Sequence, residues 1–348
     1  MERIEFPREI IVKDGAVKEI PKLVKKFDGF QSLLLVLGMK TRDIIGKQTL
    51  DILTEKGYNT TCVYVKKSDH TTLERLKKHA KMIKADLVIG MGGGKNIDMA
   101  KGIANFLKAP YFSVPTILSH DGIASNRAVI SKGKKKYPLL ASPPLAIVAD
   151  LDIITKAPKR FFSAGCGEVI SKKTSALDWK LANIEKREKY DEYASNLAYL
   201  SANLIIKNSK NYEKNYKSSI KLLLKTLIVC GISMSITNSS RPCSGSEHMF
   251  WNAIDRLYPE NKALHGEKVA LGTYIMSFLH GINHEEIKDA MISYNLPINS
   301  NQIKIPSNIL IKALSTAHKV RSDNRYTILR NGIKKDTAEK VLKRLEVI

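Results

Sequence analysis

Two histidines and one glutamate in the second half of the chain have the residue types of a catalytic metal site. His248 lies at the start of a predicted helix that Ser246 is suited to cap, and His265 stands just before another predicted helix. Two imidazoles presented from neighbouring helix starts can share a divalent ion, and a site with an open position commonly adds a carboxylate. Glu168, at a third predicted helix start, supplies one. Isolated histidines more often pack or cap, so spacing alone leaves that alternative open.

Another histidine pair, His280 and His284, has the i, i+4 spacing of zinc-binding helices. It lacks the glutamate that follows the first histidine in such helices, and Gly281 lies between the two. We interpret this pair as a helix end on the surface. The four cysteines have no CxxC spacing, so we expect reduced, packed thiols: Cys62, Cys166, Cys230 and Cys243.

Three consecutive glycines, Gly92, Gly93 and Gly94, follow a predicted strand and precede a predicted helix. Residues without a Cβ can take positive φ and let a phosphate approach the backbone, where the N–H groups of a helix start bind it. The triplet matches neither GxGxxG nor the GxxxxGK[ST] loop, so a tight structural turn is the alternative. Asp98, in the first helical turn, favours the helix dipole and can bond a nearby loop or a ligand hydroxyl.

A polar segment follows the next predicted strand. Thr116, Ser119 and Ser125 can hydrogen-bond a nucleotide, and Asp121 can orient a substrate hydroxyl. In an open parallel sheet, the loops at the carboxyl ends of the strands form the binding crevice. The alternative is local capping of helices by these side chains.

The predicted secondary structure that positions these residues changes from mixed strands and helices to helices alone near the middle of the chain. Before Asp150, apolar strands alternate with helices, which predicts a parallel, doubly wound sheet. The expected strands span 32–38, 61–65, 86–90, 111–114 and 145–149, the helices 41–55, 73–83 and 95–107, and a hairpin 127–130 with 137–140. After Asp150, helices are expected at 167–182, 193–206, 220–236, 247–257 and 268–279. We therefore predict a dinucleotide-binding α/β domain (1–155) and a helical metal- and substrate-binding domain (156–348), with the site in the cleft between them.

The composition is that of a globular protein, with 43% hydrophobic and 26% charged residues. The net charge of +23 is dispersed, with one dense run from Lys132 to Lys136, and the aromatic fraction is only 7%. We expect no sequence-specific nucleic-acid binding. The longest apolar run, 222–229, is interrupted by Lys225 and Thr226, so no membrane span is predicted. The charged start, 1–5, lacks an apolar signal core, and we expect a cytoplasmic protein.

Taken together, these motifs resemble the iron-containing alcohol dehydrogenase superfamily, which includes glycerol dehydrogenase and 3-dehydroquinate synthase. The motifs are the glycine triplet with Asp98, the loop from Thr116 to Asp121, Ser163–Glu168, and the segments around His248 and His265. Ser239–His248 resembles the glycerol-1-phosphate dehydrogenase branch, and the resemblance runs from about Ile4 to Leu345. It implies a dehydroquinate synthase-like fold: a Rossmann-like α/β domain followed by an all-α domain.

The resemblance also implies ligands. Zn²⁺ would be held by Glu168, His248 and His265. NAD(H) or NADP(H) would lie on two loops, made of Gly92, Gly93, Gly94, Lys95, Asn96, Ile97 and Asp98, and of Thr116, Ile117, Leu118 and Ser119. Lys40, after the first strand, can meet a 2′-phosphate. The family usually has Asp where this chain has Glu168, and His where it has Asn252.

The activity implied is reduction of dihydroxyacetone phosphate to sn-glycerol 1-phosphate, the backbone of archaeal-type ether lipids. The substrate would lie among Asp121, Glu168, Asn252 and Arg241. Arg241, in a serine-rich loop, can grip phosphate bidentately, or instead pair with a carboxylate such as Glu247. The alternatives are a glycerol dehydrogenase, a dehydroquinate synthase-like lyase and a binding protein without the chemistry. A homo-oligomer is possible.

Overall fold

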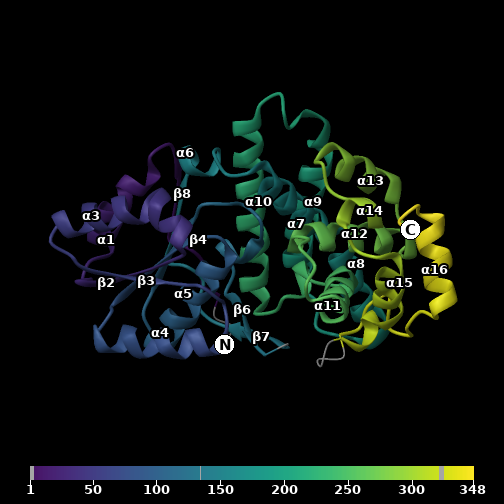
Figure 1. Ribbon diagram of the computed structural model, residues 1–348, viewed down its shortest axis with the longest axis horizontal. Coiled ribbons are helices and arrows are strands. Elements are labelled where there is room, and N and C mark those ends of the chain that lie inside the picture. The colour runs from purple at the N-terminus through teal and green to yellow at the C-terminus, as the bar shows by residue number, and fades with distance from the viewer. Residues whose placement is uncertain (1–3, 134, 321–324) are drawn as a thin grey trace. The chain divides into compact units, whose positions relative to one another are not determined.

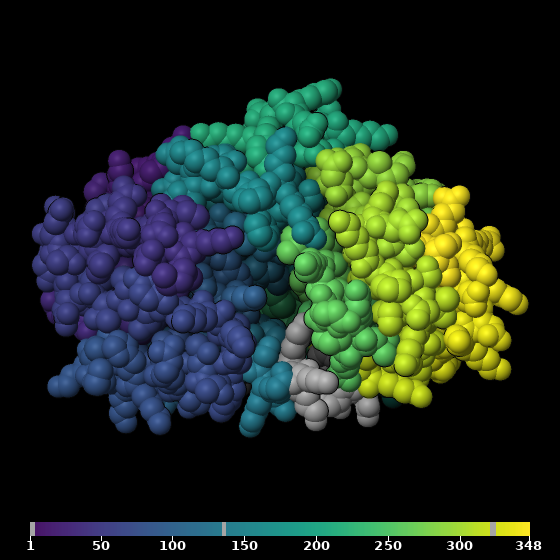
Figure 2. Space-filling model, in the orientation of Figure 1, coloured from purple at the N-terminus to yellow at the C-terminus, as the bar shows by residue number. Residues whose placement is uncertain are grey.

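The computed structural model describes residues 4–133, 135–320 and 325–348. Lys134, in the dense lysine run, and residues 1–3 of the charged start therefore lie outside the described residues. The chain divides into two compact units, residues 1–158 and 159–348, and each is described by itself. The colours of Figures 1 and 2 run from purple to teal through the first unit and from teal to yellow through the second.

The first unit contains the strands. They are β1 (Glu9–Lys13), β2 (Ser32–Leu37), β3 (Asn59–Tyr64), β4 (Leu87–Gly92), β5 (Tyr111–Pro115), β6 (Arg127–Lys132), β7 (Lys135–Leu140) and β8 (Ala146–Asp150). Its helices are α1 (Ile20–Phe27), α2 (Met39–Thr41), α3 (Lys47–Glu55), α4 (His70–Met82), α5 (Gly94–Leu107) and α6 (Leu151–Ile154). The predicted helix 41–55 thus begins as α2 and passes through a π-helical turn, Arg42–Gly46, before α3.

Six strands form one parallel sheet in the order β1-β8-β5-β4-β2-β3, which confirms the predicted doubly wound class. The chain runs from β2 outward to β3, and then β4 pairs on the opposite side of β2. This reversal puts the carboxyl end of β4, where the three glycines lie, at the topological switch point where such sheets bind ligands. Strand β1 was not predicted, although its Ile10, Ile11 and Val12 are β-branched residues typical of strands.

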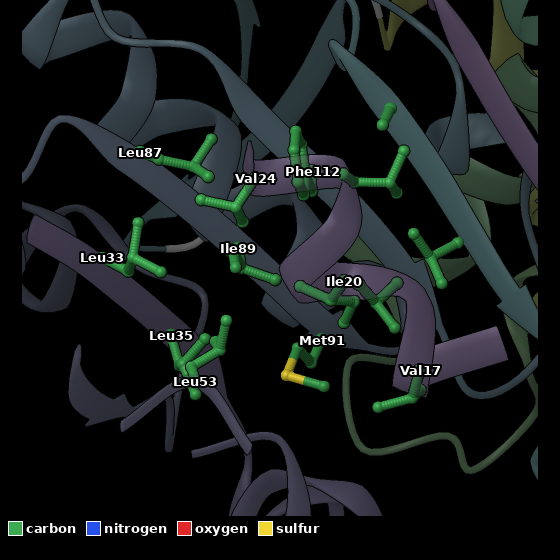
Figure 3. Packing of buried hydrophobic residues seen from close by; sticks show 14 of the residues in the cluster. Val17, Ile20, Val24, Leu33, Leu35, Leu53, Leu87, Ile89, Met91 and Phe112 are labelled. Carbon is green, nitrogen blue, oxygen red and sulfur yellow. The ribbon is translucent and has the colours of Figure 1, made fainter. Parts of the chain in front are cut away.

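Strand β2 is apolar along its length because helices cover both of its faces. Leu33, Leu35 and Leu37 pack with α1 and α3 in one core, part of which Figure 3 shows. Leu34 and Val36 point the other way, into a core built with α4 and α5. The predicted hairpin is confirmed as the separate antiparallel pair β6–β7.

The second unit is helical throughout its described residues. Its helices are α7 (Lys159–Ile170), α8 (Lys172–Lys186), α9 (Glu192–Lys207), α10 (Tyr216–Thr237), α11 (Ser246–Leu257), α12 (His265–Leu279), α13 (His284–Ser293), α14 (Ser300–Ile303), α15 (Ser307–Thr316) and α16 (Lys335–Arg344).

The helix predicted over 167–182 is wrong in its boundaries, because Ser171 separates α7 from α8. Glu168 consequently lies in the last turn of α7 and not at a helix start. Among the residues that the structure describes, one helix, α10, is long and apolar enough to cross a membrane by length and composition. In its most apolar window, 67% is buried inside the structure, as in the core helix of a globular unit.

The Asp150 side chain, at the carboxyl end of β8, connects this strand to the segment that follows β1. Its carboxylate accepts hydrogen bonds from the backbone N–H groups of Gly15 and Val17, at 3.2 and 3.1 Å, and from that of Asp152 at 3.0 Å. The side chain is buried, so water cannot replace these bonds.

We expect Asp150→Ala to lower the free energy of unfolding by about 2–4 kcal/mol, because it leaves buried N–H donors without their acceptor. Urea denaturation followed by circular dichroism would measure this loss. Asp51→Ala, which removes an exposed carboxylate from α3, is the control and should change stability by less than about 0.5 kcal/mol. Equal effects of the two substitutions would contradict this role of Asp150.

Candidate metal centre and cofactor loop

Glycines let the helices of the second unit approach closely enough to bring three ligand candidates together. A Cβ at Gly266 would lie 1.8 Å from the carbonyl oxygen of Ala164, and one at Gly167 would lie 2.5 Å from that of Gly266. Any larger residue at these positions would separate α7 from α12. The close packing places His265, at the first position of α12, beside Glu168 near the end of α7.

Glu168, His248 and His265 each offer a ligand atom, and the three atoms lie within 4.8 Å of one another. The Nε2 atom of His265 is 2.8 Å from Oε2 of Glu168, and the Nε2 atom of His248 is 3.7 Å from Oε1. The glutamate is almost fully buried, whereas the His265 side chain is 32% exposed. The cluster is therefore buried around Glu168 and accessible to solvent at His265.

Lys172, which is completely buried, donates to Oε1 of Glu168 over 2.6 Å and to the carbonyl oxygen of Cys243 over 3.1 Å. Burial by itself raises the pKa of the Glu168 carboxyl, but the charge of Lys172 and the contacts with His265 and His248 outweigh it. The pKa of Glu168 is thus held well below its usual value. The carboxylate is negatively charged and available as a ligand at neutral pH.

His248 is oriented by its neighbour Glu247. Oε1 of Glu247 lies 2.8 Å from Nδ1 of His248, so this nitrogen carries a proton, and Nε2 faces Glu168. Burial lowers the pKa of His248, but its contacts with Glu168 and Glu247 raise it above the ordinary value overall. Glu247 is itself held by Gly245 N–H at 2.6 Å and by the Thr174 hydroxyl at 2.7 Å.

The predicted cap of α11 by Ser246 is wrong. Ser246 is already the first residue of the helix, and its own N–H donates to the Asp178 carboxylate at 2.6 Å. Asp178 comes from α8, so this helix start is stabilised by a carboxylate 68 residues away in sequence. The same carboxylate accepts from Ile328 N–H, at 2.7 Å.

The cluster fits a divalent cation by two observations. Oε2 of Glu168 is buried and has no hydrogen bond of acceptable geometry among the described residues, although His265 lies close by. A buried carboxylate oxygen in that position is costly unless a cation or a donor satisfies it. The donor set, two imidazoles and one carboxylate, is that of catalytic sites that leave one coordination position open.

The other histidine pair lies elsewhere. The His280 side chain is only 9% exposed, and its Nε2 atom lies 3.0 Å from Asp178, so our placement of it on the surface was wrong. His284 packs edge-on against the ring of Phe278. Among the described residues, these two belong to no group of ligand atoms suited to a metal.

Asn252, half-buried, follows His248 by one turn of α11.

Arg241 is engaged by a carboxylate, though not by Glu247. Its guanidinium makes a two-pronged ion pair with Glu188, in which Nε is 2.6 Å from Oε1, and it donates to the carbonyl oxygen of Tyr326 at 2.9 Å. The residue is only 5% exposed. The structure thus favours an ion pair with a carboxylate, the alternative to phosphate binding by Arg241. The partner is Glu188, which the sequence did not suggest.

The glycine loop of the first unit has the geometry of an anion site. Gly92 has φ of +130°, which favours glycine, and Gly93 is the extended residue that precedes α5. Asn96 and Ile97 donate their N–H groups to the carbonyl oxygen of Gly93, at 3.0 and 3.3 Å. The N–H groups of Gly94 and Lys95, at the helix start, have no acceptor within the helix and are suited to bind phosphate.

Several residues predicted to bind the cofactor have side chains that pack or form hydrogen bonds within the protein. The Asn96 side chain donates to the carbonyl oxygen of Met91 at 2.9 Å, and Ile97 is fully buried. Asp98 accepts from Val129 N–H at 3.0 Å, and burial raises its pKa to about 6. These side chains support the loop.

Ser125 is also used internally. It is 1% exposed, and its hydroxyl contacts the buried ammonium of Lys101 at 3.3 Å and the carbonyl oxygen of Arg127 at 3.2 Å. Burial lowers the pKa of Lys101 to about 8. The Ser125 hydroxyl is thus engaged within the protein, and its contact with a nucleotide stays a prediction.

The second predicted loop begins beside the glycines. Thr116 donates its N–H to the carbonyl oxygen of Gly92 at 3.2 Å, and a Cβ at Gly93 would lie 2.8 Å from Cδ1 of Ile117. Leu118 is buried, whereas Ser119 and Asp121 are half-buried. Lys40 is exposed in α2, directly after the carboxyl end of β2.

Two residues that support the metal cluster were not identified from the sequence. Lys172 stands four residues after Glu168, a spacing that joins charged side chains on a helix and could have suggested the pair. Glu247 directly precedes His248, and a histidine ligand commonly donates its second N–H to a carboxylate. The contact of Asp178 with α11 has no such local signal.

The chain was compared with known proteins. Residues 11–158 match the family model described as "Iron-containing alcohol dehydrogenase". A glycerol-1-phosphate dehydrogenase [NAD(P)+] of Methanosarcina mazei is 39% identical over 345 residues, covering 99% of this chain and 96% of that protein. One of Pyrococcus furiosus is 38% identical over the whole of both chains, 100% of each.

Among solved structures, a probable glycerol dehydrogenase from Sinorhizobium meliloti superposes with a TM-score of 0.78 at 20% identity, covering 99% of this chain and 98% of that chain. A sulfoacetaldehyde reductase from Bifidobacterium kashiwanohense in complex with NAD+ superposes with a TM-score of 0.74 at 15% identity, with coverage of 99% and 98%. At these identities the similarity shows the fold alone, an α/β sheet followed by helices.

We expect His265→Ala to remove most of the bound divalent metal while the fold persists, because two protein ligands rarely hold a catalytic ion and this side chain is partly exposed. Elemental analysis of the purified, dialysed protein measures the metal, and circular dichroism measures the fold. His284→Ala is the matched control, since it removes an imidazole of similar exposure, 29% against 32%. Metal loss from the control alone would place the site at His284.

Proposed function

We propose that this chain, which belongs to the family of glycerol-1-phosphate dehydrogenases, reduces dihydroxyacetone phosphate to sn-glycerol 1-phosphate with NADH or NADPH. The observation that carries the proposal is the convergence of Glu168, His248 and His265 in a chain similar to these enzymes along its whole length. The reaction moves a hydride from the nicotinamide to the ketone carbon and adds a proton to the oxygen. The product would serve as the backbone of archaeal-type ether lipids.

The three ligand residues would hold Zn²⁺, which supplies a Lewis acid that polarises the carbonyl. The protein prepares this site with charges that are already in place. Lys172 keeps Oε1 of Glu168 fixed, so that Oε2 remains directed at His265. Glu247 keeps the Nδ1 proton of His248 in place and leaves Nε2 for coordination. Such prearranged groups need no reorganisation during the reaction.

The glycine loop would bind the pyrophosphate of the cofactor through the N–H groups of Gly94 and Lys95. The positive φ of Gly92 favours glycine, and the missing Cβ of Gly94, which would lie 2.6 Å from Nε2 of His120, lets that ring pack against the helix start. Lys40, at the end of β2, would lie where the ribose of the adenosine half is bound in doubly wound folds, and its charge suits a 2′-phosphate. This arrangement favours an enzyme that accepts NADPH as well as NADH.

The extra methylene of Glu168 is compatible with the proposed metal role. A longer side chain needs a second fixed point to hold its carboxylate in one place, because it has one more rotatable bond than aspartate. Lys172 provides this point from the first position of α8. We therefore propose that the Glu168–Lys172 pair stands in for the shorter, stiffer aspartate that the family usually carries.

The experiment that tests the function compares substrates. We expect NAD(P)H consumption with dihydroxyacetone phosphate, and a kcat/KM at least tenfold lower with unphosphorylated dihydroxyacetone, a difference of about 1.4 kcal/mol or more. Loss of NAD(P)H absorbance measures both rates. In the reverse direction, sn-glycerol 1-phosphate should be oxidised and sn-glycerol 3-phosphate should not. Preference for dihydroxyacetone would instead indicate a glycerol dehydrogenase.

A second prediction concerns phosphate selection. Since Glu188 already engages Arg241, we expect Arg241→Ala and Glu188→Ala to lower the free energy of unfolding alike, by about 1–3 kcal/mol. The kcat/KM ratio between the two substrates should stay unchanged in both variants. If Arg241→Ala alone lowers activity on dihydroxyacetone phosphate selectively, Arg241 leaves Glu188 to bind the phosphate.

A further inference from the structure

Trp251 in α11 lies against both histidines of the candidate metal cluster. Its ring centroid is 4.2 Å from that of His265, with the two ring planes at 79°, and 6.0 Å from that of His248, with the planes at 89°. The centroids of the two imidazoles are themselves 5.3 Å apart. Three rings from two helices thus form one compact group, in which the indole makes a T-shaped contact with each imidazole.

Helix geometry explains why the tryptophan lies there. Trp251 follows His248 by three residues, so both side chains project from the same face of α11. Gly272 follows His265 by seven residues, about two turns along the same face of α12, and a Cβ there would lie 2.9 Å from the carbonyl oxygen of Glu247. This close approach of the two helices brings the first turn of α12 beside the second turn of α11, where Trp251 lies.

His265 is the most exposed of the three ligand candidates. Its backbone is held at the start of α12, where the carboxylate of Glu267 accepts a hydrogen bond from the Leu264 N–H group at 2.7 Å. Its side chain, however, is 32% exposed, whereas those of Glu168 and His248 are 3% and 9% exposed. An exposed side chain loses rotamer freedom when it becomes a ligand, and this loss weakens binding unless a neighbouring group already restricts the side chain.

We propose that Trp251 is a positioning residue of the metal centre and holds the His265 imidazole in the orientation that binds a divalent cation. The inference rests on the proposed function, because it takes the cluster to be a metal site. The indole restricts the imidazole on one side, and Oε2 of Glu168 lies 2.8 Å from its Nε2 atom. Trp251 acts through the ligand and adds no donor atom, so its removal should weaken metal affinity without changing the ligand set.

Calorimetric titration of the metal-free full chain with Co²⁺ at constant pH measures this effect. We expect Trp251→Ala to bind Co²⁺ about three- to tenfold more weakly, because the imidazole then samples further rotamers before it binds. Trp251→Leu, which fills more of the space without a planar ring, should be weakened likewise. Trp251→Phe, which retains an aromatic ring, should stay within about twofold of the parental affinity.

A matched control exists outside the cluster. The ring of Phe278 packs edge-on against His284, with centroids 5.2 Å apart and planes at 87°, so Phe278→Ala removes the same kind of contact from another imidazole. It should leave Co²⁺ affinity unchanged. Glu168→Gln should abolish the binding, which assigns the titrated site to the cluster. Circular dichroism and thermal unfolding verify that each variant folds.

Tryptophan fluorescence tests the position of the indole independently of affinity, because bound Co²⁺ quenches nearby tryptophans most strongly. The chain has two tryptophans, and Trp179 lies about 10 Å farther along α8 than Lys172, which contacts Glu168. Saturating Co²⁺ should therefore quench most of the emission of Trp179→Phe, in which Trp251 remains. It should quench a clearly smaller fraction of the emission of Trp251→Phe, in which Trp179 remains.

The outcomes separate the role of Trp251 from the metal centre itself. A parental chain that binds no Co²⁺, or binding that persists in Glu168→Gln, would overturn the proposed metal centre and the role of Trp251 with it. Parental affinity in both Trp251→Ala and Trp251→Leu would overturn the role of Trp251 alone. Equal quenching of the two tryptophans, or equal weakening by Phe278→Ala, would also overturn that role and leave the metal centre in place.

Discussion

The burial of one carboxylate constrains the whole centre of the second unit. Glu168 is 2% exposed and negatively charged, and an isolated charge in such a place costs several kcal/mol. Lys172 offsets part of this cost from one side, and His248 and His265 approach from the other. The lysine neutralises the carboxylate without covering Oε2, so the site keeps an oxygen that still attracts a cation.

This arrangement depends on backbones that approach closely at glycines. Gly167 and Gly266 let α7 and α12 touch, and Gly272 lies where a Cβ would be 2.9 Å from the carbonyl oxygen of Glu247 in α11. Three helices thus meet around the carboxylate at distances that larger residues would forbid. These three helices come from different regions of the sequence. Small residues at their contacts are therefore as necessary for assembling the cluster as the ligands themselves.

Much of the fold could be predicted from sequence because the signals are local. Strand β2 is apolar on both faces, which predicts a covered sheet, and the glycine triplet marks the turn after β4. The candidate ligands could be identified by their residue types, and the structure brings them together. The predicted position of Glu168 at a helix start was wrong because no proline or glycine marks the helix break at Ser171. The partners of Arg241 and Ser246 lie 53 and 68 residues away, so no local pattern contains them.

The two candidate sites are built by different physical means. The glycine loop in the first unit presents backbone N–H groups, so the anion affinity we propose for it would follow from conformation. The neighbouring side chains of Asn96 and Asp98 stabilise that conformation. The cluster in the second unit presents side-chain atoms, and the cation affinity we propose for it would follow from a charge balance among Glu168, Lys172 and two histidines. A backbone site tolerates changes of side chain that preserve its φ and ψ angles. A side-chain site tolerates backbone adjustment but not the loss of a charge, because each partner there offsets the desolvation of another.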